Sequence, residues 1–346
     1  MIPAFLSFDV EPDAFQIFPD ARPKWGGYAA QYEFAAELRK ELTSGAGHKP
    51  RFGWYFRTDP QIEQVCGRAD AAMMLYPDRI DRLSAEGDYF GVHAHPMRWS
   101  HPYDRWVHDV EDPQWLRDCT EFSLNAFQQW NRSPATLFRA GANYMSNDII
   151  DVLDARGVIA EMSLEPVTGY WMDDKVVRTS IDESPVVGTF TDLSTAPRVP
   201  YRPAREDFRV AGASEARNLA IVPSTTGARW LPKVGCLHNV ERVIRKIVKP
   251  EGPHALYLSL DCPNDQYYWD LISYELASMR RPYLSVAMRT DAAGSPVVGM
   301  LRRRLTALAH HPLAEQLRFV NPLEVLRSLL PGYTIPAHHG SARSVA

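Results

Sequence analysis

Residues 4–12 read Ala4-Phe5-Leu6-Ser7-Phe8-Asp9-Val10-Glu11-Pro12, a short apolar run that ends among acidic residues. The run predicts a buried strand over residues 4–10, the first strand of the fold. Asp9 and Glu11 are separated by one residue, so an extended chain turns both side chains to the same side. We therefore expect two carboxylates to lie together at the end of this strand.

Strand-like runs alternate with helical stretches along most of the chain. Residues 28–42 carry apolar side chains at helical spacing, and a second strand-like run follows at residues 51–56. This alternation is typical of repeated β/α units in an α/β fold, and it argues against a helix bundle or a β-sandwich. Further strands are expected at residues 89–95, 136–139, 158–164, 219–223, 255–260 and 283–288, and further helices at 78–86, 238–248, 266–279 and, as a pair, 297–330.

The helix after the third expected strand has a recognisable start. Asp112 can cap it, and Pro113 suits its first position, where the missing N–H costs nothing. Helical spacing then predicts an apolar stripe made of Trp115, Cys119, Phe122 and Ala126.

The segment at residues 165–217 breaks the alternation. It carries several prolines among polar residues, and long excursions of this kind are seldom plain connectors. We therefore expect residues 1–330 to form a single β/α barrel, with an insertion at 165–217 near the functional site. A loose C-terminal tail is expected at residues 331–346.

The composition excludes several classes of protein. The chain of 346 residues has 42 acidic and 38 basic side chains, which gives no basic footprint for nucleic acid or an anionic membrane. No stretch approaches the roughly 18 apolar residues of a membrane span, and the N-terminus lacks the features of a signal peptide. We therefore expect a cytoplasmic protein whose four widely spaced cysteines are reduced.

Ionisable side chains stand at the ends of seven expected strands. The carboxyl ends of the strands meet at one edge of a parallel β/α barrel, so these side chains should share one polar mouth. In chain order they are Asp9 and Glu11, Arg57 and Asp59, His93 and His95, Arg139, Glu165, Asp261, and Arg289.

His93 and His95 repeat the alternate spacing of the two carboxylates. Two imidazoles and one carboxylate would supply three ligands and leave an open position for water, as in catalytic sites of Zn²⁺. Ni²⁺, Co²⁺ or Fe²⁺ would also suit these donors. Taken separately, the acidic pair could equally belong to an acidic turn after the strand. The histidine pair could equally be buried for structural reasons. Taken together, they predict a divalent metal site.

Over residues 4–290 these segments resemble the polysaccharide deacetylase family of metal-dependent carbohydrate esterases. The first family motif, T-F-D-D-G-P, is similar to Ser7-Phe8-Asp9-Val10-Glu11-Pro12, with the second acid two residues after the first. The resemblance implies an incomplete or distorted (β/α) barrel. It also implies that Asp9 is the catalytic base and that Glu11 is a metal ligand.

The second family motif places two metal-binding histidines four residues apart, ahead of a proline. The corresponding stretch here is His93-Ala94-His95-Pro96, with the histidines two apart. The resemblance therefore implies His93 and His95 as ligands, with His101 as the alternative to His95.

The remaining motifs concern proton transfer. Phe138-Arg139-Ala140-Gly141 resembles the family's third motif, whose arginine orients the base, and this implies that role for Arg139. The last motif ends in a histidine that acts as general acid, but the matching stretch here is Leu258-Ser259-Leu260-Asp261. Asp261 could take over as the acid if its pKa were raised.

The resemblance implies a metal-dependent hydrolase that removes an acyl group, above all N-acetyl, from a sugar or glycan. Two alternatives remain open. A glycoside hydrolase would set Asp9 or Glu11 against Asp261 or Glu165, without a metal. A non-catalytic relative would bind sugars and have no working acid.

Overall fold

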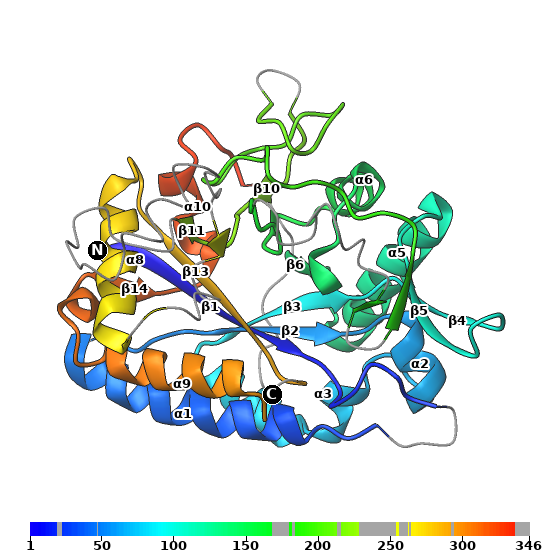
Figure 1. Ribbon diagram of the computed structural model, residues 1–346, viewed down its shortest axis with the longest axis horizontal. Helices are drawn as coiled ribbons and strands as arrows, with labels where there is room; N and C mark the ends of the chain where they lie inside the picture. Colours follow the sequence, from blue (N-terminus) through cyan, green and yellow to red (C-terminus); the bar gives the residue numbers. More distant parts are fainter. Residues whose placement is uncertain are drawn as a thin grey trace, which may run out of the picture.

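The computed structural model describes residues 1–18, 23–46, 48–167, 180–181, 184–212, 216–227, 254–255, 262, 264–291 and 294–335. Its main sheet is a parallel half-barrel (Figure 1) with the strand order β10-β7-β6-β3-β2-β1-β13, and β14 also pairs with β1. The strands are β1 Ile2–Val10, β2 Gly53–Arg57, β3 Tyr89–Ala94, β6 Leu137–Ala140, β7 Ala160–Glu161, β10 Ala220–Ile221, β13 Leu284–Arg289 and β14 Leu317–Phe319. The expected α/β class and incomplete barrel are therefore confirmed.

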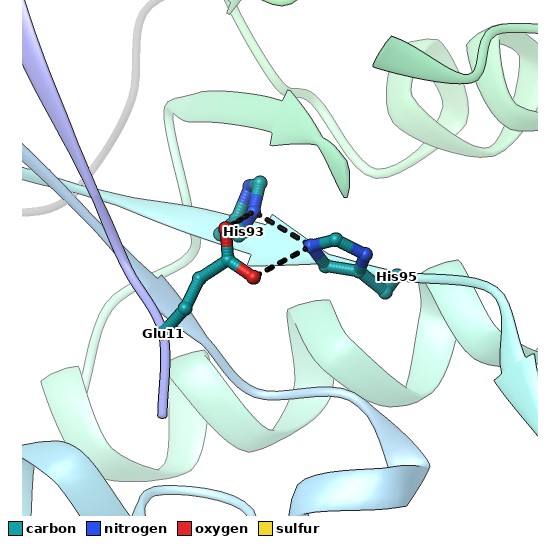
Figure 2. Close-up of side chains that lie close together, drawn as sticks. All are labelled: Glu11, His93 and His95. Carbon is teal, nitrogen blue, oxygen red and sulfur yellow. Dashed lines mark hydrogen bonds and ion pairs between the residues drawn. The ribbon is translucent and has the colours of Figure 1, made fainter. Parts of the chain in front are cut away.

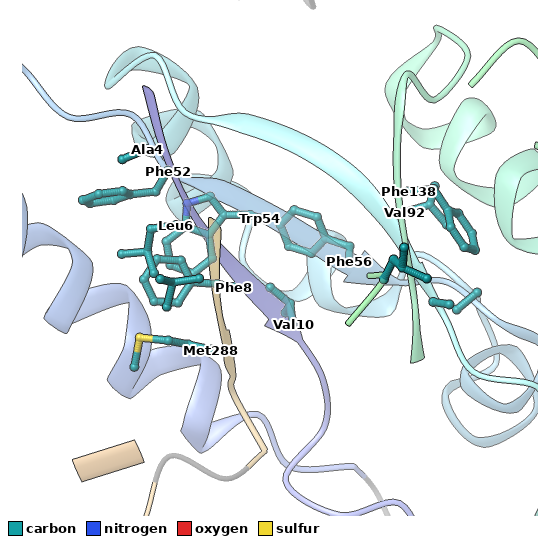
Figure 3. Packing of buried hydrophobic residues seen from close by; sticks show 14 of the residues in the cluster. Ala4, Leu6, Phe8, Val10, Phe52, Trp54, Phe56, Val92, Phe138 and Met288 are labelled. Atoms are coloured by element: carbon teal, nitrogen blue, oxygen red, sulfur yellow. The ribbon is translucent and has the colours of Figure 1, made fainter. Parts of the chain in front are cut away.

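Both faces of this sheet are buried, and alternation along β1 separates them. Leu6, Phe8 and Val10 belong to the outer cluster (Figure 3), which also contains the apolar faces of the surrounding helices. Phe5 belongs to a separate inner cluster, to which residues of α10 contribute. Asp9 follows Phe5 in this alternation, so the chain turns its first carboxylate toward the inside of the half-barrel.

The helices of the described ranges follow the strands in sequence, and of these α10 contributes to the inner cluster. They are α1 Gly26–Ala46, α2 Pro60–Cys66, α3 Ala71–Leu75, α4 Pro77–Ala85, α5 Pro113–Asn131, α6 Asn147–Ala155, α8 Asp265–Ser278, α9 Pro296–Leu308 and α10 Pro322–Leu329. None of the helices in the described ranges combines the length and the apolar character that crossing a bilayer requires.

Helix α5 begins as predicted, because the Asp112 carboxylate accepts hydrogen bonds from the N–H groups of Gln114 and Trp115. Of the predicted apolar stripe only Cys119 is fully buried, whereas Trp115, Phe122 and Ala126 are half-buried. Trp115 shows why. Its indole N–H donates to the Pro96 carbonyl at 3.2 Å, so the ring packs against the segment after β3. The buried face of α5 is made of Leu116, Cys119, Thr120, Ser123, Leu124, Phe127 and Trp130.

A smaller sheet lies beside the end of β3 and joins the insertion to it. Its order is β4-β5-β9-β8, and β4 and β5 form an antiparallel hairpin directly after Pro96. The strands are β4 Met97–Ser100, β5 Arg105–Asp109, β9 Ser184–Val187 and β8 Ser180–Ile181. The expected insertion therefore contributes two strands to a sheet next to the candidate site.

The elements expected in the C-terminal third of the chain are described only in part. The strand expected at 255–260 is described only at its first residue, where β12 His254–Ala255 pairs antiparallel with β11 Thr226–Gly227. The helix pair expected at 297–330 is present as α9 and α10, and β14 lies in the connection between them. Residues 256–261, with Asp261, lie outside the described residues, and so does the helix expected at 238–248. The division into a unit at 1–330 and a tail at 331–346 stays a prediction.

Candidate metal centre

Glu11, His93 and His95 converge at the carboxyl ends of β1 and β3 (Figure 2). The Nε2 atom of His95 lies 3.1 Å from Glu11 Oε2 and 3.0 Å from His93 Nε2. The Nε2 atom of His93 lies 3.5 Å from Glu11 Oε1. All three side chains are buried, and their ligand atoms lie within 4.8 Å of one another.

The backbone of Glu11 is fastened to the end of β13. Its N–H donates to the Thr290 hydroxyl at 2.7 Å, and the same hydroxyl donates to the Glu11 carbonyl at 3.0 Å. Thr290 in turn donates its N–H to the Asp9 carbonyl at 3.0 Å. This clasp, formed by Thr290 on the backbone of residues 9–11, fixes the direction in which Glu11 leaves the strand.

The two imidazoles are held in different ways. His93 Nδ1 lies 3.0 Å from the Arg139 carbonyl, which can only accept, so Nδ1 carries the proton and Nε2 is free to bind a cation. His95 is held through its backbone, because its N–H donates to the Asp59 carboxylate at 3.0 Å. Asp59 also caps α2 and pairs with Arg57. The Arg139 carbonyl therefore holds the ring of His93, and the Asp59 carboxylate holds the backbone of His95.

Burial and neighbouring charges shift the pKa of all three side chains. Burial raises the pKa of Glu11, but the two histidines lower it well below its usual value. Burial lowers the pKa of His95, and Arg57 lowers it further. Burial also lowers the pKa of His93, whereas Asp9 and Glu11 raise it and outweigh burial. A carboxylate beside two imidazole nitrogens can therefore exchange a proton for a metal ion.

Two guanidinium groups flank Glu11 without neutralising it closely. Arg57 Nη1 lies 3.9 Å from Oε2, and Arg289 Nε lies 3.7 Å from Oε1. Each has a closer carboxylate of its own, Asp59 at 2.6 Å and Asp291 at 3.0 Å. Neither guanidinium donates a hydrogen bond to Glu11 Oε2. The Glu11 carboxylate can therefore pair with a cation that binds to the two histidines.

Asp9 stands beside this cluster in a bidentate pair with Arg139. Arg139 Nε lies 2.7 Å from Oδ1, and Nη2 lies 3.2 Å from Oδ2. Arg139 is oriented from its other side, because Nη1 donates to the Met162 carbonyl. Both side chains are buried, so the plane of the Asp9 carboxylate is fixed by the guanidinium.

The structure brings together most of the side chains expected at the mouth. The Glu11 carboxylate lies close to nitrogen atoms of four of them, namely His93, His95, Arg57 and Arg289. His101 is exposed in the turn between β4 and β5, outside the cluster of ligand atoms. The chemical roles of the converging residues stay predictions.

Two residues at the site escaped the sequence analysis. Thr290 directly follows Arg289, so the pattern of polar strand ends could have included it. His108 is buried on β5, and its ring centroid lies 5.6 Å from that of His95. The alternation in Trp106-Val107-His108-Asp109 was the available signal, but strands this short are hard to distinguish from loop.

Gly141 leaves room for His95. A Cβ atom at this position would lie 2.1 Å from the His95 ring, far inside a normal contact. We expect Gly141→Ala to displace the imidazole and to weaken metal binding about 10–100-fold, the range seen when the support of a ligand is lost. Titration with Co²⁺ measures this. Gly299→Ala is the control, because a Cβ there meets nothing within 4 Å; unchanged affinity in Gly141→Ala would contradict the expectation.

No family model matches the chain, and no curated protein matches its sequence. Solved structures do resemble it. A provisionally assigned glycoside hydrolase/deacetylase from Parabacteroides distasonis has 10% identity and a TM-score of 0.52, covering 94% of this chain and 71% of that one. A provisionally assigned polysaccharide deacetylase from Mycobacterium smegmatis has 11% identity and a TM-score of 0.49, covering 94% and 89%. The likeness to the Parabacteroides distasonis structure shows the fold alone, which this chain shares with that glycoside hydrolase/deacetylase.

Proposed function

We propose that this protein is a metal-dependent hydrolase that removes an acyl group, above all N-acetyl, from a sugar or glycan. One observation carries the proposal: a buried Glu-His-His group lies next to a carboxylate that an arginine holds in place. The first is a donor set for a divalent cation, and the second supports the proposal of a base beside it. The fold of the polysaccharide deacetylase type supports this assignment.

Each residue has a separate role in the proposed reaction. Glu11, His93 and His95 would hold the cation, for which we propose Zn²⁺, with Ni²⁺, Co²⁺ or Fe²⁺ as alternatives. When bound, the cation would supply Lewis acidity to the acyl carbonyl and to water. Asp9 would accept the proton of the attacking water, and Arg139 would keep its carboxylate in one plane. Asp261 as the proton donor to the leaving amine stays a prediction, and so does the cytoplasmic location.

The first experiment measures acetate release from an N-acetylglucosamine oligomer by untagged protein. We expect acetate release that stops after treatment with a chelator and returns on addition of Zn²⁺ or Co²⁺. The reason is that Glu11, His93 and His95 would only hold the cation and would not catalyse the reaction without it. New reducing ends without acetate, insensitive to the chelator, would instead identify a glycoside hydrolase. Binding of the oligomer with neither product would identify a non-catalytic sugar-binding protein.

A further inference from the structure

Three ring nitrogens next to the candidate metal centre are without a hydrogen-bond partner among the described residues. They are Nδ1 of His95 and both nitrogens of His108, and all three are shielded from solvent. A buried polar atom without a partner costs about 1–3 kcal/mol. Such a group in a folded protein therefore needs a reason, and three of them on two adjacent rings suggest a common one.

The hairpin after β3 brings the two rings together. His108 lies directly across from Met97 in the β4–β5 pairing, and Met97 is two residues after His95. The ring centroids of His95 and His108 are 5.6 Å apart, with an interplanar angle of 46°. Phe15 packs on both rings, at 4.9 Å from His95 and 6.0 Å from His108. The His95 ring is therefore in contact with an apolar ring and with a second imidazole.

The two proposed histidine ligands differ in how their outer nitrogen is supported. His93 has the Arg139 carbonyl on Nδ1, which fixes both its tautomer and its ring orientation. Histidines that bind metals nearly always donate their second N–H in this way. His95 has no such support among the described residues, although its Nε2 faces the same cluster.

His108 has the chemical properties of the missing acceptor. Its ring lies beside that of His95, and neither of its ring nitrogens has a hydrogen-bond partner among the described residues. A neutral imidazole offers one N–H and one lone pair, so it can accept from an N–H without bringing a positive charge toward the cation.

We propose that His108 is the positioning residue of His95, and that one of its ring nitrogens accepts a hydrogen bond from the Nδ1–H of His95 when a cation is bound. This inference rests on the proposed function only in requiring that the Glu11, His93 and His95 group binds a metal. The contact keeps the His95 proton on Nδ1 and so keeps its Nε2 lone pair turned toward Glu11 and His93.

The test compares Co²⁺ binding by the native protein with that of His108→Phe and His108→Gln. Phenylalanine keeps the ring shape and removes the acceptor, whereas the glutamine amide oxygen restores one. We expect about 10–100-fold weaker binding in His108→Phe, a changed visible spectrum of bound Co²⁺, and recovery of both in His108→Gln. Trp106→Phe, two residues away on the same face of β5, is the matched control and should bind as the native protein does.

The outcomes separate this inference from the proposed function. Native binding and a native cobalt spectrum in folded His108→Phe would overturn the role of His108 and leave the metal centre standing. If the native protein bound no Co²⁺, the metal centre and this inference would both fall. If His108→Phe did not fold, His108→Leu would take its place with the same expected loss, and native affinity in that variant would overturn the inference equally.

Discussion

Replacing Asp9 by asparagine should lower the rate of acetate release about 10²–10⁴-fold, the usual contribution of a general base, while the metal stays bound. The amide keeps the shape of the side chain but cannot take a proton from water. It also leaves the Arg139 guanidinium without its buried counter-charge, so we expect a lower melting temperature as well. The turnover of the folded protein, the metal content and the thermal unfolding curve should be measured together.

Asp88→Asn is the matched control for the loss of stability. Asp88 is a buried carboxylate that accepts from Arg39 Nη2 at 2.6 and 2.7 Å and lies just before β3, at the opposite end of the strand from His93. Its replacement also breaks a buried ion pair, but it should leave the turnover of the folded protein unchanged. Native turnover in Asp9→Asn would exclude Asp9 as the base. Loss of metal in that variant would assign it a ligand role instead.

Replacing His93 or His95 by alanine should remove most of the bound metal, which we expect at about one ion per native chain. Each substitution deletes one of three converging donors, and the loss should exceed the 10–100-fold typical of an outer supporting group. Elemental analysis of protein purified without a histidine tag measures the content directly. Circular dichroism checks that each variant has folded.

His101→Ala decides between the two possible second ligands. His101 is exposed in the β4–β5 turn, so its loss should leave the metal content unchanged. Loss of metal in His101→Ala with retention in His95→Ala would transfer the ligand role to His101. Full occupancy in both His93→Ala and His95→Ala would reject the ligand set.

The sequence predicted the parts of the fold that depend on local periodicity. The strand at residues 4–10 and the strand-end positions of His93 and Arg139 follow from strand alternation and the parallel arrangement. The structure has β1 over Ile2–Val10 and places His93 and Arg139 near the carboxyl ends of β3 and β6. The cap of α5 at Asp112 was predictable because the capping signal lies within a few residues.

Features that depend on distant partners could not be predicted in this way. The buried face of α5 includes Thr120 and Ser123, whose hydroxyls donate hydrogen bonds to backbone carbonyls of the same helix. A hydrophobicity pattern does not mark polar residues as buried, so it could not locate this face. His108 reaches the site through the pairing of two short strands, and Thr290 through a contact 279 positions away from Glu11. Only the folded chain brings such pairs together.

The clasp of Thr290 on Glu11 has a consequence for how the protein is made. The Thr290 hydroxyl that holds Glu11 lies 279 positions further along the chain, directly after β13, and is synthesised that much later. Until then the growing chain lacks one of the strands that flank β1, and the direction of the Glu11 side chain is not fixed. Contacts of such long sequence separation form slowly and leave strand edges open in the meantime. The clasp on Glu11 therefore forms only after the chain has been synthesised as far as Thr290.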